Sequence, residues 1–144
     1  MGCVSDRYGL ARFVDAQDAG GTYAQALREL REGGKRSHWM WFVFPQVAGL
    51  GRSATAQRFA IDGRSEAAAY LAHDVLGERL RECAQALVDL GATDAVTVLG
   101  PVDAQKLRSS MTLFAEVSDD EPLFAQVLDQ YFAGQHDDAT LERL

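Results

Sequence analysis

The feature that most constrains this chain is a helical spacing of apolar residues that recurs along its length. Between residues 76 and 90 they stand four, three, four and three positions apart: Leu76, Leu80, Cys83, Leu87 and Leu90. That spacing puts them on one face of an α-helix, which repeats about every 3.6 residues. At least six segments share the pattern, and no two stretches make a convincing strand pair. The sequence predicts a compact all-α bundle of about seven or eight short helices, a single domain over residues 1–144.

Turn and capping residues indicate where the expected helices begin and end. Gly20-Gly21, Gly33-Gly34, Gly91 and Gly100-Pro101 are expected breaks. Thr22 with Gln25 resembles a capping box, Ser65 and Asp138 are expected caps, and Asp74, Asp103 and Pro122 are expected first residues of helices. Residues 38–43 and 94–99 are each predicted to form one helical turn, although an extended conformation is the alternative for both.

The net charge and the cysteine and histidine content exclude several classes of protein. The 144 residues have a formal net charge of −7, which disfavours general nucleic-acid binding because duplex affinity depends on neutralising phosphates. No apolar run approaches the length of a membrane span, and no signal peptide is visible, so a cytoplasmic protein is expected. Two cysteines and three scattered histidines show no metal-ligand spacing. Cys3 is expected in a frayed terminus and Cys83 in the core.

A block of twelve residues, Lys35 to Gln46, combines aromatic and polar chemistry (KRSHWMWFVFPQ). It contains both tryptophans of the chain, Trp39 and Trp41, and every residue from Trp39 to Phe44 is apolar. Aromatic side chains dominate cores and interfaces, and apolar surface edged by polar groups is typical of small-ligand pockets. The tryptophans are two positions apart, so on a helix only one of them is expected to face the core.

Polar residues beside this block, and on the 103–114 segment, are the candidate site residues. The candidates for ligand binding are Lys35, Ser37, His38, Trp39, Trp41, Gln46, Arg52, Asp103, Lys106 and Ser110. Polar groups among apolar residues cost free energy unless they are paired. The 35–53 block and the 103–114 helix are therefore expected to meet, with any ligand at their junction. His38 and Lys106 are the candidates for a catalytic role, His38 because imidazole titrates near neutral pH.

Each candidate also has a purely structural interpretation. Gly49, Gly51, Arg52 and Ser53 precede an expected helix, where they form either an anion site or an ordinary cap. Asp103 and Lys106 are three apart and suit a surface ion pair. A buried serine such as Ser110 often bonds the carbonyl four residues earlier.

Three blocks of the chain resemble a known family: KRSHWMWFVFPQVAGLGRS (35–53), AYLAHDVLGERLREC (69–83) and GPVDAQKLRSSMTLF (100–114). They are similar to the small bacterial family called domain of unknown function 1810, in order and over almost the whole chain. The resemblance implies a compact all-helical domain and no established activity. Members are sometimes labelled calpastatin, a label that nothing in this sequence supports.

A second, weaker likeness involves residues 103–134. This segment is similar to the C-terminal half of the YbiA-like (NADAR) proteins, which act on N-glycosidic bonds of ADP-ribose-type and phosphoribosyl compounds. The glutamate-centred motif of that family has no convincing counterpart here. The alternative interpretation is that the likeness consists only of two successive amphipathic helices.

Two classes of function follow from the sequence. In the first, the domain binds a small anionic nucleotide or ADP-ribose-type ligand, or hydrolyses its N-glycosidic bond, without a cofactor. In the second, it is a non-enzymatic interaction or regulatory module with an unidentified protein partner. Convergence of the polar candidates on one cavity favours the first class. Their dispersal to separate solvent regions favours the second.

Overall fold

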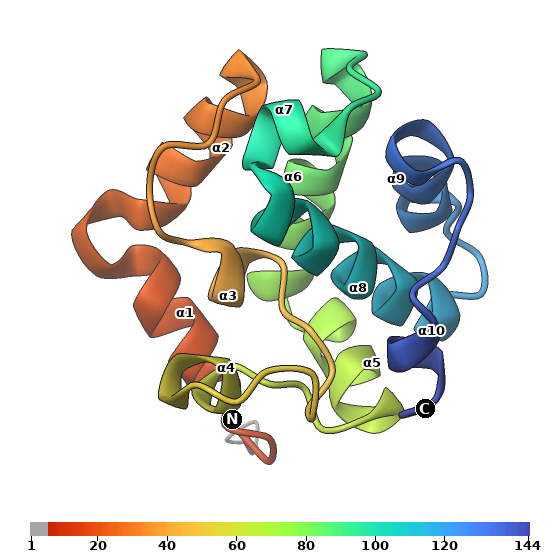
Figure 1. Ribbon diagram of the computed structural model, residues 1–144. Coiled ribbons are helices and arrows are strands. Elements are labelled where there is room, and N and C mark those ends of the chain that lie inside the picture. Colours follow the sequence, from red (N-terminus) through yellow and green to blue (C-terminus); the bar gives the residue numbers. More distant parts are fainter. Residues whose placement is uncertain (1–5) are drawn as a thin grey trace.

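The computed structural model describes residues 6–144, and within that range the chain is all-α (Figure 1). The helices are α1 (Ala11–Asp18), the 3-10 turn η1 (Ala19–Gly21), α2 (Thr22–Glu32), α3 (Met40–Val43), α4 (Ala54–Arg58), α5 (Arg64–Ala72), α6 (Leu76–Leu90), α7 (Ala95–Leu99), α8 (Pro101–Val117), α9 (Leu123–Phe132) and α10 (Asp138–Leu141). The all-α prediction is confirmed, including helical turns at both ambiguous segments. The helices outnumber the expected seven or eight because several are only four or five residues long.

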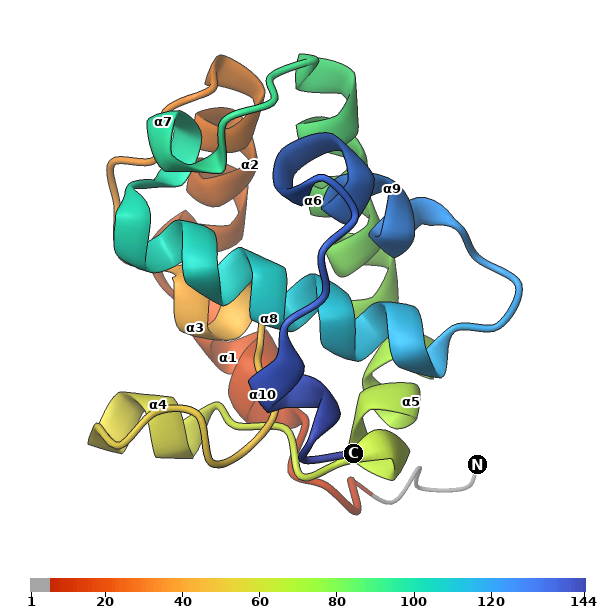
Figure 2. The same ribbon diagram turned by 45° about the vertical axis from the view of Figure 1, so that its right-hand side comes forward.

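Two long helices, α6 and α8, organise the domain. Helix α6 contacts α2, α5 and α9, whereas α8 contacts α5, α7, α9 and α10. Figures 1 and 2 show α8 crossing the middle of the molecule, with α7 at its start and α10 beside it. Four of the five residues on the predicted α6 stripe, Leu76, Leu80, Cys83 and Leu87, are buried, so the spacing does mark the core-facing side.

Aromatic rings connect the helices through the core. Phe13 of α1 contacts Tyr70 of α5, Tyr70 contacts Phe114 of α8, and Phe114 contacts Phe124 of α9, with ring centroids 5.1 to 5.9 Å apart. These are separations at which aromatic pairs attract each other. The chain of rings fixes α1 and α9, which are far apart in sequence, against the same α5–α8 pair. It also places the Phe124 face of α9 against α8.

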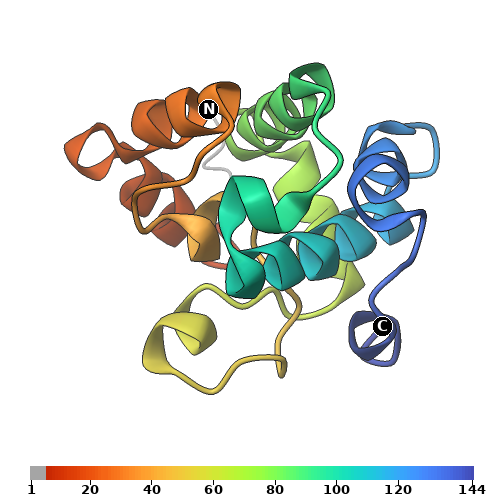
Figure 3. The same ribbon diagram turned by 45° about the horizontal axis from the view of Figure 1, so that its top comes forward.

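Residues 46–61 form a loop that contains α4 and stands apart from the main helices, at the lower edge of Figure 3. A single parallel bridge closes it: Ala48 donates its N–H to the Ile61 carbonyl, and Ile61 donates to the Gln46 carbonyl, each at 2.8 Å. Arg12 fastens the loop to α1 by donating to the carbonyls of Arg58 and Ala60 at 2.6 and 2.8 Å. The 46–61 loop is therefore closed at its two ends and fastened to α1 near residue 60.

The predicted capping box at Thr22 and the predicted helix start at Asp74 are both wrong, because neighbouring residues satisfy the helix ends. Thr22 donates its hydroxyl to the Ala19 carbonyl and forms no capping box, since α2 follows η1 directly. Asp74 does not start α6; the His73 Nδ1 atom accepts the N–H groups of Val75 and Leu76. An imidazole nitrogen can serve as such an acceptor when it is unprotonated.

The other predicted helix starts are shifted by one or two residues. Gly63 precedes α5 in place of Ser65, and Asp137 caps α10 in place of Asp138. Helix α8 begins at Pro101, two residues before Asp103, because proline needs no N–H partner in a first turn. Pro122 lies just before α9.

Residues 6–144 were also compared with the requirements of a membrane span and of a metal site. None of their helices is long and apolar enough to cross a membrane. Within residues 6–144, no cluster of three or more histidine, cysteine or acidic side chains is arranged to hold a metal ion. Cys83 is a free, buried thiol, as predicted, whereas Cys3 lies outside the described residues.

Candidate functional site: a groove between residues 46–51 and helix α8

The aromatic block and the start of α8 meet, as predicted. Lys35 Nζ lies 2.8 Å from one carboxylate oxygen of Asp103, and Lys106 Nζ lies 3.3 Å from the other. The Lys106 ammonium also sits 3.8 Å from the centroid of the Trp41 ring, a cation–π contact. Asp103 thus joins a lysine of the block to a lysine of α8, which fixes the two segments side by side.

A groove opens where these segments meet, and we call it the charged cavity. Its volume is about 450 Å³, within the range of small-molecule sites. Its walls come from Trp41, Gln46, Leu50, Gly51, Val102, Gln105, Lys106, Ser109, Asp137 and Ala139. Residues from the aromatic block, from α8 and from α10 therefore converge on one space.

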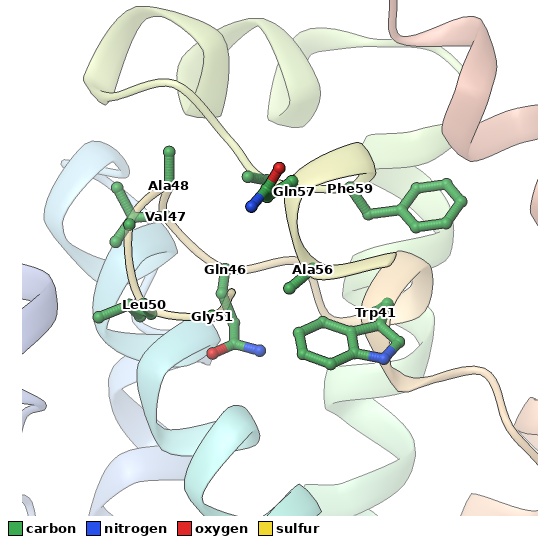
Figure 4. A pocket seen from close by; sticks show the side chains of 11 residues that line it. Trp41, Gln46, Val47, Ala48, Leu50, Gly51, Ala56, Gln57 and Phe59 are labelled. Carbon is green, nitrogen blue, oxygen red and sulfur yellow. The ribbon is translucent and has the colours of Figure 1, made fainter. Parts of the chain in front are cut away.

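A second, smaller hollow of about 200 Å³ lies next to it, inside the 46–61 loop (Figure 4). We call it the neutral cavity, because none of its lining residues bears a formal charge. They are Trp41, Gln46, Val47, Ala48, Gly49, Leu50, Gly51, Ala56, Gln57, Phe59 and Ala60. The two cavities share Trp41, Gln46, Leu50 and Gly51, so these four residues form the border between them.

Gln46 is the polar residue on this border. The backbone carbonyl of Gln46 accepts the Ile61 N–H in the bridge, but the buried side-chain Nε2 of Gln46 has no hydrogen-bond partner. In Figure 4 the Gln46 amide projects between Leu50 and Gly51 on one side and Trp41 on the other. A buried N–H donor without an acceptor costs roughly 1–3 kcal/mol. Such a donor beside a cavity is a natural contact for a ligand acceptor.

Trp41 and Trp39 have different environments, as their two-residue spacing predicts. Trp39 is buried in the core, where its Nε1 donates to Glu29 at 3.0 Å. Trp41 is half-buried and lines both cavities. Both tryptophans were predicted to contact a ligand, but only Trp41 lines a cavity in which a ligand could bind.

Glu29 explains why several predicted site residues lie away from the groove. This fully buried carboxylate accepts hydrogen bonds from the Ser37 hydroxyl at 2.6 Å, from the Arg36 and Ser37 N–H groups, from Gln25 and from Trp39. Burial alone would raise its pKa, but these donors outweigh burial and hold the pKa well below its ordinary value. The cluster fixes the turn after α2. Ser37 and Trp39 therefore stabilise this turn by donating to Glu29 and are not part of the groove.

Three further candidates also lie outside the groove. The side chains of His38 and Arg52 are exposed, and neither residue lines the two cavities. The predicted anion site before α4 is an ordinary cap, because the Ser53 hydroxyl accepts the Ala56 N–H at 3.0 Å. Ser110 is fully buried with an unpartnered hydroxyl, and the neighbouring Ser109 faces the charged cavity instead. One helical position corresponds to about 100° of rotation, which accounts for the difference.

Asp137 is a site residue that the sequence did not reveal. Its buried carboxylate accepts from Ser109 Oγ at 2.9 Å, from Gln105 Nε2 at 3.1 Å, and from the hydroxyl and N–H of Thr140. These bonds fasten α10 to α8 and so build one wall of the charged cavity. Only the capping pattern Asp137-x-x-Thr140 could have indicated its position.

Within residues 6–144 the fold is that of a compact all-helical protein. The chain belongs to the family described as "Protein of unknown function (DUF1810)", which matches residues 7–144. Among solved structures, it is similar to the "Crystal structure of the conserved hypothetical protein Rv1873 from Mycobacterium tuberculosis at 1.38 A". The two share 45% sequence identity and a TM-score of 0.92, over 96% of this chain and 98% of that chain. No curated protein matches the chain.

Proposed function

We propose that this domain binds a small anionic ligand in the charged cavity. The observation that supports this most directly is the unpartnered Gln46 amide on the wall of a cavity that also contains the Lys106 ammonium. A phosphate or carboxylate oxygen supplies both an acceptor for the amide and a counter-charge for the lysine. Ligand binding would therefore recover the free energy lost by burying the amide.

The charges around Lys106 favour an anion although the whole chain is acidic. Lys35 and Lys106 share the single carboxylate of Asp103, so this trio has a net charge of +1. The Lys106 side chain is only 18% exposed, which weakens screening by water and salt. Asp137, the acidic residue in the cavity wall, keeps its formal charge of −1, and four hydrogen bonds from neutral donors of Gln105, Ser109 and Thr140 stabilise that charge.

Binding has better support than hydrolysis of an N-glycosidic bond. Such a reaction commonly needs a carboxylate free to act as a base or nucleophile. Asp137 is the carboxylate among the residues of the charged cavity, and its oxygens already accept from Ser109, Gln105 and Thr140. Of the two predicted catalytic candidates, His38 does not line the cavity, and Lys106 lines it as a cation paired with Asp103.

A thermal-shift experiment with inorganic phosphate, ribose 5-phosphate, AMP and ADP-ribose tests the proposal. Ligand at about 100 times its Kd adds roughly 2.7 kcal/mol of stability. The informative variant is Gln46→Leu, which replaces the unpartnered amide with an apolar side chain of similar size. We expect it to melt at the same or a higher temperature than the wild type, and to lose the ligand-induced shift. Lys106→Met should also lose the shift.

Gln126→Leu is the matched control, because Gln126 is exposed on α9 and lines neither cavity. It should keep the full ligand-induced shift. A shift that survives in both Gln46→Leu and Lys106→Met would place the ligand elsewhere. The absence of any shift with all four compounds would contradict the proposal.

A second candidate function is that of a protein-interaction module, and one observation favours it. An apolar groove of about 650 Å³ lies between α1 and α5, with Tyr8, Leu10, Val14, Ala69 and Val75 in its walls. Apolar grooves of this kind commonly receive the side chains of a partner protein. Replacing Val14 by Asp should then abolish partner capture without changing the thermal shifts above.

A further inference from the structure

The two cavities that meet at Gln46 differ in both size and chemistry. The charged cavity contains Lys106 and Asp137, whereas no lining residue of the neutral cavity is charged. The neutral cavity measures about 200 Å³, which is below the ~300–1,000 Å³ typical of a complete small-molecule site. It is large enough for one ring system, and thus for part of a ligand.

Aromatic and small side chains give the neutral cavity a form suited to a flat group. Trp41 and Phe59 supply aromatic surface, and Ala56 and Ala60 supply only methyl groups. Gly51 brings the border close to Trp41: a β-carbon added there would lie 3.6 Å from the Trp41 ring and 2.6 Å from the Ala56 methyl group. The close approach of the loop leaves a narrow space beside the indole.

We propose that the ligand has two parts, a flat uncharged heteroaromatic ring in the neutral cavity joined to an anionic group in the charged cavity. This inference rests on the proposed function and adds the class of ligand. The unpartnered Gln46 amide, on the shared border, donates to an acceptor atom of the ring or of its linkage. Lys106 binds the anionic group, and Trp41 contacts both parts.

Calorimetric titration with AMP, adenosine and ribose 5-phosphate tests the two-part ligand, since the last two compounds are fragments of the first. We expect AMP to bind at least about tenfold more tightly than either fragment. Lys106→Met should reduce the affinity for AMP to about that for adenosine, and should weaken adenosine binding far less than AMP binding, because only AMP carries the anionic group. Arg28→Met is the control, because Arg28 is an exposed cation on α2 that lines neither cavity. It should bind all three compounds as the wild type does.

Nuclear Overhauser contacts locate the ring without a mutation that could disturb folding. With methyl-labelled alanine, the base protons of bound AMP should contact the methyl groups of Ala56 and Ala60 in the neutral cavity. Ala139, which lines only the charged cavity, is the internal control and should show no contact with the base.

The outcomes separate this inference from the proposed function. If ribose 5-phosphate binds as tightly as AMP, and both depend on Lys106, the anion site stands and the two-part ligand is wrong. Contacts from the base to Ala139 in place of Ala56 would also overturn it. If none of the three compounds binds at millimolar concentration, both proposals fall.

Discussion

The Lys106 ammonium lies over the face of the Trp41 indole, 3.8 Å from the ring centroid, while 3.3 Å from the Asp103 carboxylate. One residue of α8 thus orients the aromatic ring that borders both cavities. The lysine remains part of the wall of the charged cavity, where a third partner can reach it. The contact of Lys106 with Trp41 stabilises the free protein and also positions a positive charge for a ligand. It therefore links the fold to the proposed site.

We expect Lys106→Met to cost less than about 2 kcal/mol of unfolding free energy. A cation–π contact is worth roughly 0.5–2 kcal/mol, and Asp103 keeps Lys35 as its partner. Urea denaturation measures the difference, and unfolding should stay cooperative with the same slope. A much larger loss would mean that Lys106 is mainly a structural residue.

We expect Glu29→Gln to cost about 2–4 kcal/mol, because several buried donors lose a charged acceptor. Glu32→Gln, on the same helix, is the control. Glu32 is exposed and pairs only with Arg36 in a surface ion pair, so its loss should cost less than about 1 kcal/mol. Equal losses for the two variants in urea denaturation would show that the Glu29 cluster does not stabilise the turn.

The Glu29 cluster also predicts the direction of a pH effect. The folded-state pKa of Glu29 is below the ordinary value of 4.5, so its contribution to stability is complete above that pH. The contribution is lost as the pH falls toward the folded-state pKa, because the unfolded chain then binds the proton more readily. The stability difference between wild type and Glu29→Gln should therefore shrink below about pH 4.5. A difference that grows on acidification would contradict this assignment.

We expect Gly51→Ala to destabilise the protein by about 1–3 kcal/mol. The added β-carbon would lie 2.6 Å from the Ala56 methyl group, so the 46–51 segment or α4 must move. Gly34→Ala is the matched control, since a β-carbon there meets no atom within 4 Å. Thermal unfolding of both variants measures the difference. If Gly51→Ala is as stable as Gly34→Ala, the border of the two cavities is looser than this packing implies.

We expect Phe124→Ala to cost about 3–5 kcal/mol, as for other fully buried aromatic residues. The ring contacts Phe114, 5.9 Å away between centroids, and joins α9 to α8. Val102→Ala, at a residue that is 68% exposed, should change stability by less than about 0.5 kcal/mol. A loss below about 1 kcal/mol for Phe124→Ala in denaturant unfolding would mean that α9 is weakly packed.

The helices were predictable because their apolar residues repeat with the helical period, as on α6 and α9. The meeting of the aromatic block with α8 was also predictable, since both segments place polar groups among apolar residues, and such groups need partners. Glu29 was not identified, although it follows the buried Ala26 and Leu27 and precedes Leu30 on the core side of α2. A charged residue at such a position is the signal that could have found it.

Two other features depended on distances that a sequence does not contain. Asp137 reaches the site because α10 folds back on α8. Asp137 there bonds Ser109, which is 28 residues earlier in the chain. Whether Ser109 or Ser110 faces the charged cavity depends on the rotation of α8 about its axis. The contacts of α8 with α5, α7 and α9 determine that rotation together. Tertiary packing, and not local pattern, decides such cases.

The most direct measurement is the side-chain amide resonance of Gln46 in a ¹⁵N spectrum, assigned by its loss in Gln46→Leu. AMP and ribose 5-phosphate are titrated separately into the labelled protein. We expect the Gln46 amide signals to shift and saturate with AMP, at the concentrations at which calorimetry reports binding. Saturating AMP that leaves the Gln46 amide unmoved, or that shifts only residues of the α1–α5 groove, would contradict the assignment of the ligand site.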